Sequence, residues 1–150
     1  MKNRKVRILL GDDSHTDADL AFISLKKLGI KEEEIYWVEN GEAVLNYLME
    51  GEDLESRTAA LQLVILDLKM PRVSGKMVLR ELRKYYPVYS LPVVIWSSSA
   101  LKEDIEDCYD LGANSYLIKP IQFREFQEKM ELIVKYWLGI NKTPSFGARP

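Results

Sequence analysis

Five short apolar runs divide the chain, at residues 6–10, 35–38, 63–66, 91–97 and 115–118. They are rich in Val, Ile and Leu, and most of them stop at a turn or polar residue. Continuous apolar runs of this length are typical of strands in a parallel sheet, where both faces of the sheet are covered. The pattern therefore predicts five strands, with those at 63–66 and 93–96 buried in the middle of the sheet.

Between these runs the apolar residues recur every three or four positions, which is typical of amphipathic helices. We expect helices at about 18–28, 41–48, 77–86, 103–111 and 122–138. Ser14 or Thr16 can cap the start of the first helix, and Gly29 and Gly112 end two of them. The polar segment 49–60 has no such period, and we interpret it as an exposed loop.

Strands that alternate with helices predict an α/β fold with a doubly wound parallel sheet. A chain of 150 residues is most simply one domain, which we place at residues 1–140 and follow with a flexible tail at 141–150. The tail is too short to fold as an output domain of its own.

Composition excludes several classes of function. A formal net charge of −2 argues against binding nucleic acid through general electrostatics. No apolar stretch approaches the ~20 residues of a membrane span, and the N-terminus lacks a secretion signal. The single cysteine, Cys108, excludes an internal disulfide and fits a reducing compartment. We therefore expect a cytoplasmic protein.

Polar and charged residues follow four of the five predicted strands. Asp12 and Asp13 end the first strand, Asp67 the third, Ser97 the fourth and Lys119 the fifth. Because the carboxyl ends of parallel strands meet at one edge of the sheet, these groups should converge there. Asp67 alone could merely cap the next helix, but the convergent set favours a functional site.

Three carboxylates close together repel one another unless a cation lies between them. Mg²⁺ prefers oxygen ligands and typically binds one or two carboxylates together with a phosphate oxygen. Lys119 and Ser97 can hold phosphoryl oxygens, and a carboxylate oxygen of Asp67 can act as the nucleophile. The residues therefore predict a site for Mg²⁺ and a phosphoryl group.

With these residues the chain resembles the receiver domain of two-component response regulators over about residues 4–138. The resemblance includes Met70-Pro71 and Gly75 after Asp67, and the spacings from Asp67 to Ser97 and from Ser97 to Lys119. It implies a flavodoxin-like receiver fold with strand order 2-1-3-4-5. It also implies a signalling phosphoacceptor, rather than an enzyme acting on other substrates, in a phosphorelay.

The resemblance assigns roles to individual residues. Asp67 would accept the phosphoryl group, and Ser97 and Lys119 would hold its oxygens. Asp13, Asp67 and the backbone carbonyl of Lys69 would bind Mg²⁺ directly, with Asp12 acting largely through water.

Two further features come from the same resemblance. Tyr116 would be the aromatic switch that moves as Ser97 closes on the phosphoryl group. The Lys119–Pro120 peptide bond is expected to be cis.

Two alternatives to the phosphoacceptor have different requirements. A pseudo-receiver would act as a binding module without phosphate, and the complete set of acids, Ser97 and Lys119 argues against it. A phosphatase with an aspartyl intermediate would want a second acid two residues after Asp67, where Lys69 stands.

The expected partners are a sensor histidine kinase or phosphotransfer protein and a downstream protein target. The long last helix and the loop before the third strand also resemble small regulators of bacteriophytochrome kinases. In that helix Phe123, Phe126, Met130, Ile133 and Trp137 form one stripe, interpreted as the core face.

Leu132 and Tyr136 make a second apolar strip on the same helix. Ordinary edge packing would explain it, but we favour a protein interface. Receivers commonly dimerise or bind targets through this helix, the strand at 115–118 and the helix at 103–111.

Overall fold

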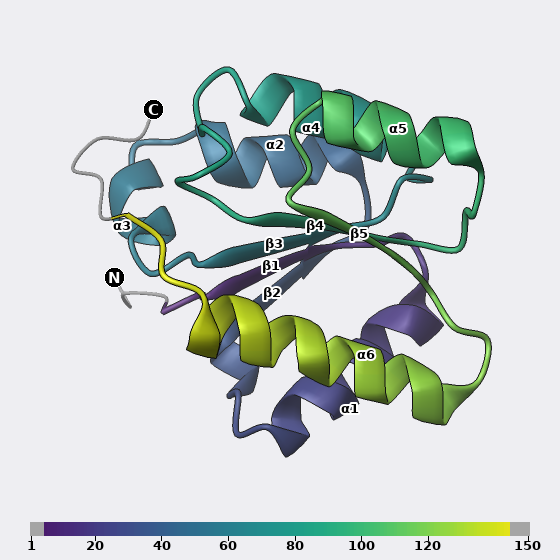
Figure 1. Cartoon of the computed structure of the whole chain (residues 1–150). Coiled ribbons are helices and arrows are strands. Elements are labelled where there is room, and N and C mark those ends of the chain that lie inside the picture. The colour runs from purple at the N-terminus through teal and green to yellow at the C-terminus, as the bar shows by residue number, and fades with distance from the viewer. Residues whose placement is uncertain (1–4, 145–150) are drawn as a thin grey trace.

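A computed structural model describes residues 5–144 of the chain (Figure 1). Its sheet contains β1 (Ile8–Gly11), β2 (Ile35–Val38), β3 (Leu63–Leu66), β4 (Val93–Ser97) and β5 (Ser115–Ile118). The strands lie in the order β2-β1-β3-β4-β5, and every neighbouring pair is parallel. The predicted fold class and strand order are confirmed.

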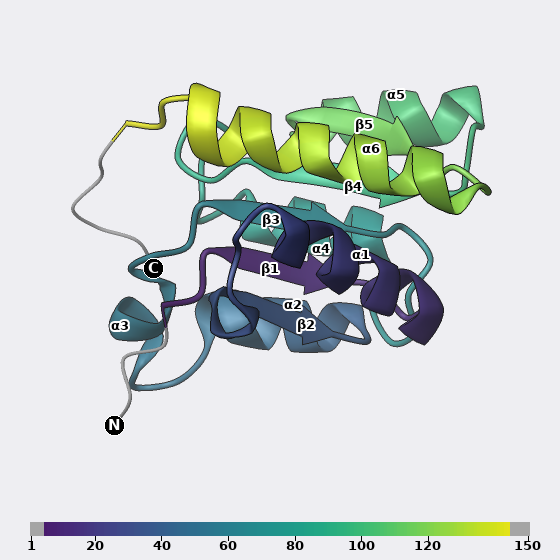
Figure 2. The ribbon, with the colours of Figure 1, turned by 90° about the horizontal axis from the view of Figure 1, so that it is seen from below.

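Helices cover both faces of the sheet. On one face lie α1 (His15–Lys27) and α6 (Phe123–Val134), side by side in Figure 2, and on the other lie α2 (Gly41–Met49), α4 (Gly75–Leu82) and α5 (Lys102–Asp110). Successive strand residues point to opposite faces, so that Ile95 packs in one core cluster and Trp96 in the other. Every residue of β1, β3 and β4 is therefore buried, whereas the edge strands β2 and β5 are only partly covered.

The register of the sheet brings the strand ends to one edge. Gly11 pairs with Leu66, and Ser97 pairs with Ile118. The residues that come next in the chain, Asp12, Asp67 and Lys119, consequently emerge at the same end of the sheet.

Helix starts follow the local sequence closely. The Ser14 side chain accepts a hydrogen bond from the Asp17 amide at 3.2 Å and caps α1. Ser74 caps α4 in the same way, with its hydroxyl 3.3 Å from the Met77 amide nitrogen. Of the two predicted caps for α1, Ser14 is therefore the one used.

The segment 49–60 is largely exposed, as predicted, but the prediction that it is a loop was wrong. The segment contains a short helix, α3 (Leu54–Thr58), and Thr58 is buried. The Arg57 guanidinium donates to the carbonyl oxygens of Asn46, Tyr47 and Glu50, which lie at the end of α2. Arg57 thus satisfies carbonyls that a helix end leaves unpaired, which a search for apolar periodicity does not detect.

The last predicted helix is two elements, because α6 continues into a π-helical stretch, η2 (Lys135–Ile140). Phe126, Met130 and Ile133 are buried as predicted. Phe123 was wrongly assigned to the core, since it is 45% exposed. It is the first residue of α6, whose buried residues begin at Phe126.

Residues 141–144 have no regular secondary structure, and the rest of the predicted tail, 145–150, lies outside the described residues. Among residues 5–144, no helix combines the length and the apolar character needed to cross a membrane.

Candidate functional site

Three carboxylates meet at the carboxyl edge of the sheet. One oxygen each from Asp12, Asp13 and Asp67 lie within 4.8 Å of one another. Asp12 and Asp67 are buried, whereas Asp13 is exposed to solvent. Clustered carboxylate oxygens are the hard ligands that Mg²⁺ and similar divalent cations prefer, so the donor set fits such an ion.

Lys119 enters this cluster from the end of β5. Its Nζ lies 2.6 Å from Asp12 Oδ2, 2.8 Å from Asp67 Oδ2 and 2.9 Å from Asp17 Oδ2. The side chain is 7% exposed. An ammonium has three N–H donors, and here each has a carboxylate acceptor.

Burial and charge act in opposite directions on these groups. Burial raises the pKa of Asp12 to about 6, although the Lys119 ammonium opposes this shift. Burial likewise disfavours the charge on Lys119, but the carboxylates of Asp12 and Asp67 outweigh it and raise the pKa of the lysine. The lysine is therefore held as a cation in a site that contains more negative than positive charge.

The backbone around Asp67 is tightly constrained. Asp67 Oδ1 accepts a hydrogen bond of 2.7 Å from the Leu68 amide, and the Gly75 amide donates to the Leu68 carbonyl at 2.9 Å. A Cβ atom at Gly75 would lie 2.3 Å from the Asp67 carbonyl oxygen, so no side chain fits there. The loop from β3 to α4 thus closes directly on the backbone of the residue that presents the carboxylate.

Ser97 ends β4 beside the carboxylates and is 1% exposed. Its Oγ accepts a hydrogen bond from the Ser99 amide at 3.2 Å, and its carbonyl accepts one from the Lys119 amide at 2.8 Å. The backbone hydrogen bond between Lys119 and Ser97 therefore holds the two predicted site residues next to each other.

Tyr116 packs against the loop that follows Ser97. Its hydroxyl donates to the Ser99 carbonyl at 2.8 Å, and burial raises its pKa. The Ser99 hydroxyl in turn donates to the Asp104 carboxylate on α5. A continuous chain of contacts thus runs from the site to α5.

Sequence reasoning missed two residues of this site. The Trp37 indole donates to the Asp12 carbonyl at 2.7 Å, and Asp17 binds Lys119. One general signal for Asp17 was available, because acidic residues are favoured in the first turn of a helix. Trp37 carried no comparable signal.

Two other expectations have different outcomes. The Lys119–Pro120 bond is trans, so the expected cis bond was wrong, and trans is the isomer that peptide bonds before proline intrinsically favour. The Lys69 side chain is exposed at the rim of the site. The predicted metal-binding role of its carbonyl stays a prediction.

Residues 8–131 match a family model described as the response regulator receiver domain. The chain is also 34% identical over 137 residues to the probable methanogenesis regulatory protein FilR2 of Methanothrix harundinacea, covering 91% of this chain and 86% of that protein.

Solved structures with the same arrangement include two cyanobacterial proteins. The phosphorylated phytochrome response regulator RcpA superposes with a TM-score of 0.80 and 29% identity, covering 93% of this chain and 99% of that one. The Mn²⁺-bound response regulator Rcp1 gives a TM-score of 0.80 and 28% identity, with the same coverage.

Proposed function

Because the chain belongs to the response regulator receiver domain family, we propose that it accepts a phosphoryl group on Asp67 from a histidine kinase. The observation that carries this proposal is the convergence of Asp12, Asp13, Asp67 and Lys119 at one edge of the sheet. Buried carboxylates paired with a lysine are unusual in a core and are common where charge develops in a reaction.

In the proposed step, an Asp67 carboxylate oxygen attacks the phosphorus of a phosphohistidine. The new P–O bond forms as the P–N bond breaks, and the electron pair of that bond returns to the imidazole nitrogen. Lys119 balances the negative charge of the phosphoryl oxygens, and the Ser97 hydroxyl donates a hydrogen bond to one of them.

Asp12, Asp13 and Asp67 would hold a divalent cation, which we propose is Mg²⁺, with the backbone carbonyl of Lys69 as a further ligand. The cation supplies positive charge that lets a dianionic phosphoryl group approach the carboxylates. Asp13, being exposed, is the acid most accessible to an incoming ion.

Tyr116 and Ser97 would report the phosphoryl group to the rest of the protein. As the Ser97 hydroxyl turns toward the phosphoryl oxygens, its hydrogen bond from the Ser99 amide is lost. Tyr116 is bonded to the same Ser99 backbone, so its position responds to this change.

Beryllofluoride, which mimics an aspartyl-bound phosphoryl group, tests the proposal. Added with Mg²⁺, it should change tryptophan fluorescence, because Trp96 precedes Ser97 and Trp37 is bonded to Asp12. Asp67→Asn should abolish the response, and mass spectrometry with acetyl phosphate should show one added phosphoryl group in the wild type only. If the wild type shows neither the fluorescence change nor the added mass, or if Asp67→Asn responds as the wild type does, a phosphate-independent binding module would be favoured.

The proposed phosphoryl donor is a sensor histidine kinase of the phytochrome type or its phosphotransfer protein. The similarity to RcpA, described as a phytochrome response regulator, supports this class of partner. The test is to incubate the protein with a phosphorylated kinase of the phytochrome type and with one of an unrelated type. Phosphoryl transfer from the cognate kinase should be the faster.

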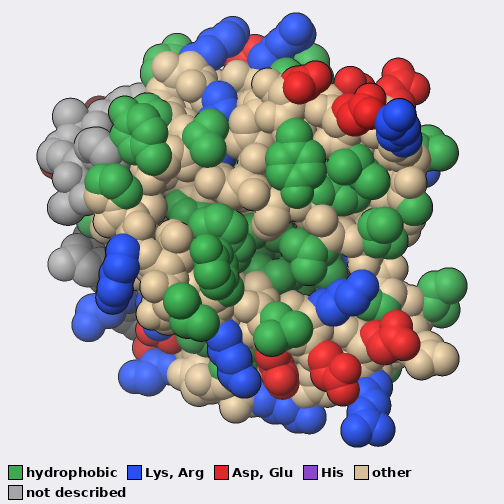
Figure 3. All heavy atoms as spheres, in the orientation of Figure 1, with side chains coloured by type: hydrophobic (Ala, Val, Ile, Leu, Met, Phe, Trp, Pro, Cys, Tyr) green, Lys and Arg blue, Asp and Glu red, His purple; other side chains and the backbone are tan. Residues whose placement is uncertain are grey.

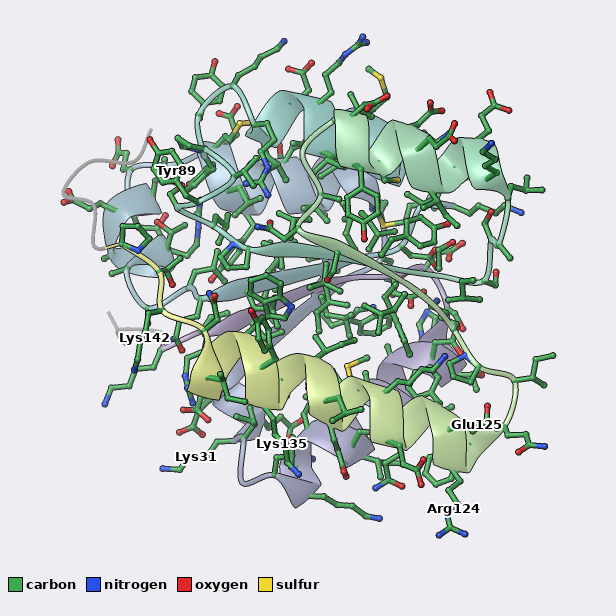
Figure 4. The ribbon with its side chains drawn as sticks, viewed as in Figure 1. Lys31, Tyr89, Arg124, Glu125, Lys135 and Lys142 are labelled. Carbon is green, nitrogen blue, oxygen red and sulfur yellow. The ribbon has the colours of Figure 1, made fainter. Side chains whose placement is uncertain are left out.

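The proposed docking surface spans α5, β5 and α6. Hydrophobic side chains gather across this face in Figure 3, over β5 and the neighbouring helices. Leu132 and Tyr136, predicted as a second strip on the last helix, are 65% and 47% exposed. Arg124 on α6 and Lys135 on η2 are exposed charged residues on the outer side of this last helical segment (Figure 4). We propose that this surface binds a second copy of the chain or a downstream target.

Light scattering with and without beryllofluoride tests homodimerisation. A dimer should appear or strengthen with beryllofluoride and be lost in Leu132→Arg. Ile23→Arg is the matched control, because Ile23 is 47% exposed on α1, outside this surface. A mass of one chain under both conditions would leave a different protein as the occupant of the surface.

A further inference from the structure

Asp17 differs from the other carboxylates that bind Lys119. Asp12 and Asp67 belong to the group that could hold a metal ion, whereas Asp17 does not. Its carboxylate is 30% exposed and lies in the first turn of α1, yet it reaches Lys119 Nζ at 2.9 Å. Its role in the site is therefore tied to the lysine rather than to the cation.

The three acceptors of Lys119 change differently when Asp67 carries a phosphoryl group. The Asp67 carboxylate becomes an acyl phosphate and loses its own charge to the phosphoryl oxygens. Asp12 would help to hold the cation, whose positive charge would offset that of the carboxylate. Asp17 is neither the acceptor nor one of the candidate metal ligands, so its contact with the lysine is the one that the phosphoryl oxygens would have to displace.

The first turn of α1 also favours the Asp17 carboxylate as an anion. Unpaired amides at a helix start carry partial positive charge, which stabilises acidic side chains there. Asp17 consequently has a second source of stabilisation and can release Lys119 without becoming an isolated charge. A group of this kind can hold the lysine in one state and give it up in the other.

We propose that Asp17 is a positioning residue that holds Lys119 in the unphosphorylated protein and competes with the phosphoryl group for its ammonium. This inference rests on the proposed acceptance of a phosphoryl group by Asp67. Asp17 thereby limits how tightly the site retains that group, and a neutral residue in its place leaves the lysine free to bind phosphoryl oxygens.

The test is titration of beryllofluoride at saturating Mg²⁺, followed by tryptophan fluorescence or calorimetry. Asp17→Asn should bind beryllofluoride on the order of 3- to 10-fold more tightly, the effect expected for removing one nearby charge in a partly solvated site. Asp17→Glu, which restores the carboxylate, should return the affinity toward that of the wild type. Asp17→Gln serves as a second neutral variant, because Gln is well tolerated at this position of a helix.

Asp19→Asn is the matched control, since Asp19 lies on the same helix, is exposed and forms no ion pair with Lys119. It removes the same charge and should leave beryllofluoride affinity within about twofold, as screening by solvent predicts for a distant surface charge. Urea unfolding of each variant identifies any effect that comes from loss of the fold.

Equal or weaker beryllofluoride binding by folded Asp17→Asn and Asp17→Gln would overturn the competition proposal. The same tightening in Asp19→Asn would also overturn it, because the effect would then be one of net charge. A wild-type protein that does not respond to beryllofluoride would instead contradict the proposed function.

Discussion

Two lysines in this molecule bind several carboxylates each, at similar distances but in different surroundings. Lys119 contacts three acids at 2.6–2.9 Å, and its side chain is 7% exposed. Lys76 on α4 contacts Asp104 and Asp107 on α5, both at 2.8 Å, and its side chain is 31% exposed.

The difference between the two clusters is one of burial, since their geometry is nearly the same. Around Lys76 water screens the charges, and removing one of them leaves the others solvated. Around Lys119 the acids outnumber the cation, and Asp12 and Asp67 have little access to water, so the charges of these groups strongly affect one another. Nearly identical ion-pair distances therefore belong to a solvated surface contact in one place and to a buried, strongly coupled cluster in the other.

The largest effect should follow removal of Lys119. Lys119→Met leaves Asp12 and Asp67 buried with no cation, which should lower the free energy of unfolding by about 3 kcal/mol without Mg²⁺. Urea unfolding at neutral pH measures this loss, and excess Mg²⁺ should recover part of it. An unchanged urea midpoint would show that the buried acids carry protons rather than negative charge.

Removal of an acid should have the opposite effect. Asp67→Asn reduces the surplus of negative charge and should raise the free energy of unfolding of the metal-free protein by about 1 kcal/mol. The gain should shrink in excess Mg²⁺, which neutralises the same surplus in the wild type. Asp107→Asn, in the solvated cluster, is the control and should give no gain in urea unfolding.

Acid should weaken metal binding through Asp12. Its pKa of about 6 means that a proton competes with the cation below this pH, so Mg²⁺ affinity should fall roughly fourfold between pH 7.5 and 5.5. Calorimetric titration at the two pH values measures the change. A constant affinity would place the pKa of Asp12 well below 6.

The raised pKa of Asp12 also determines how the stability of the metal-free protein depends on pH. The pKa of Asp12 is raised from 3.8 to about 6 in the folded protein, so the folded state holds this proton over a window where the unfolded chain has lost it. The contribution of Asp12 to metal-free stability should therefore decrease as pH rises through that window.

The smallest effect should come from Lys76. Lys76→Met removes the ion pairs of Lys76 with Asp104 and Asp107. It should lower the free energy of unfolding by only about 0.5 kcal/mol, because solvent screens these pairs. The difference from the wild type should fade at high salt in urea unfolding. A loss as large as that of Lys119→Met would remove the distinction between the two clusters.

Local pattern was enough to predict most of the fold and much of the site. Apolar runs identified all five strands, most clearly the three inner ones, because a strand covered on both faces must be apolar throughout. The residues that follow those runs supplied Asp12, Asp67 and Lys119, since parallel strands bring their carboxyl ends together. These inferences needed only the order of residues along the chain.

The sequence by itself thus determined which groups arrive at the edge of the sheet, and tertiary structure decided which of them touch. Asp17 reaches Lys119 because the fold brings the first turn of α1 to the residue that follows β5, a contact that spacing along the chain does not encode. The exposure of Phe123 and the contact of Arg57 with the end of α2 likewise depend on how the elements pack, so the sequence pattern did not predict them. Periodicity gives the face that a residue occupies, whereas contacts between elements depend on how those faces pack.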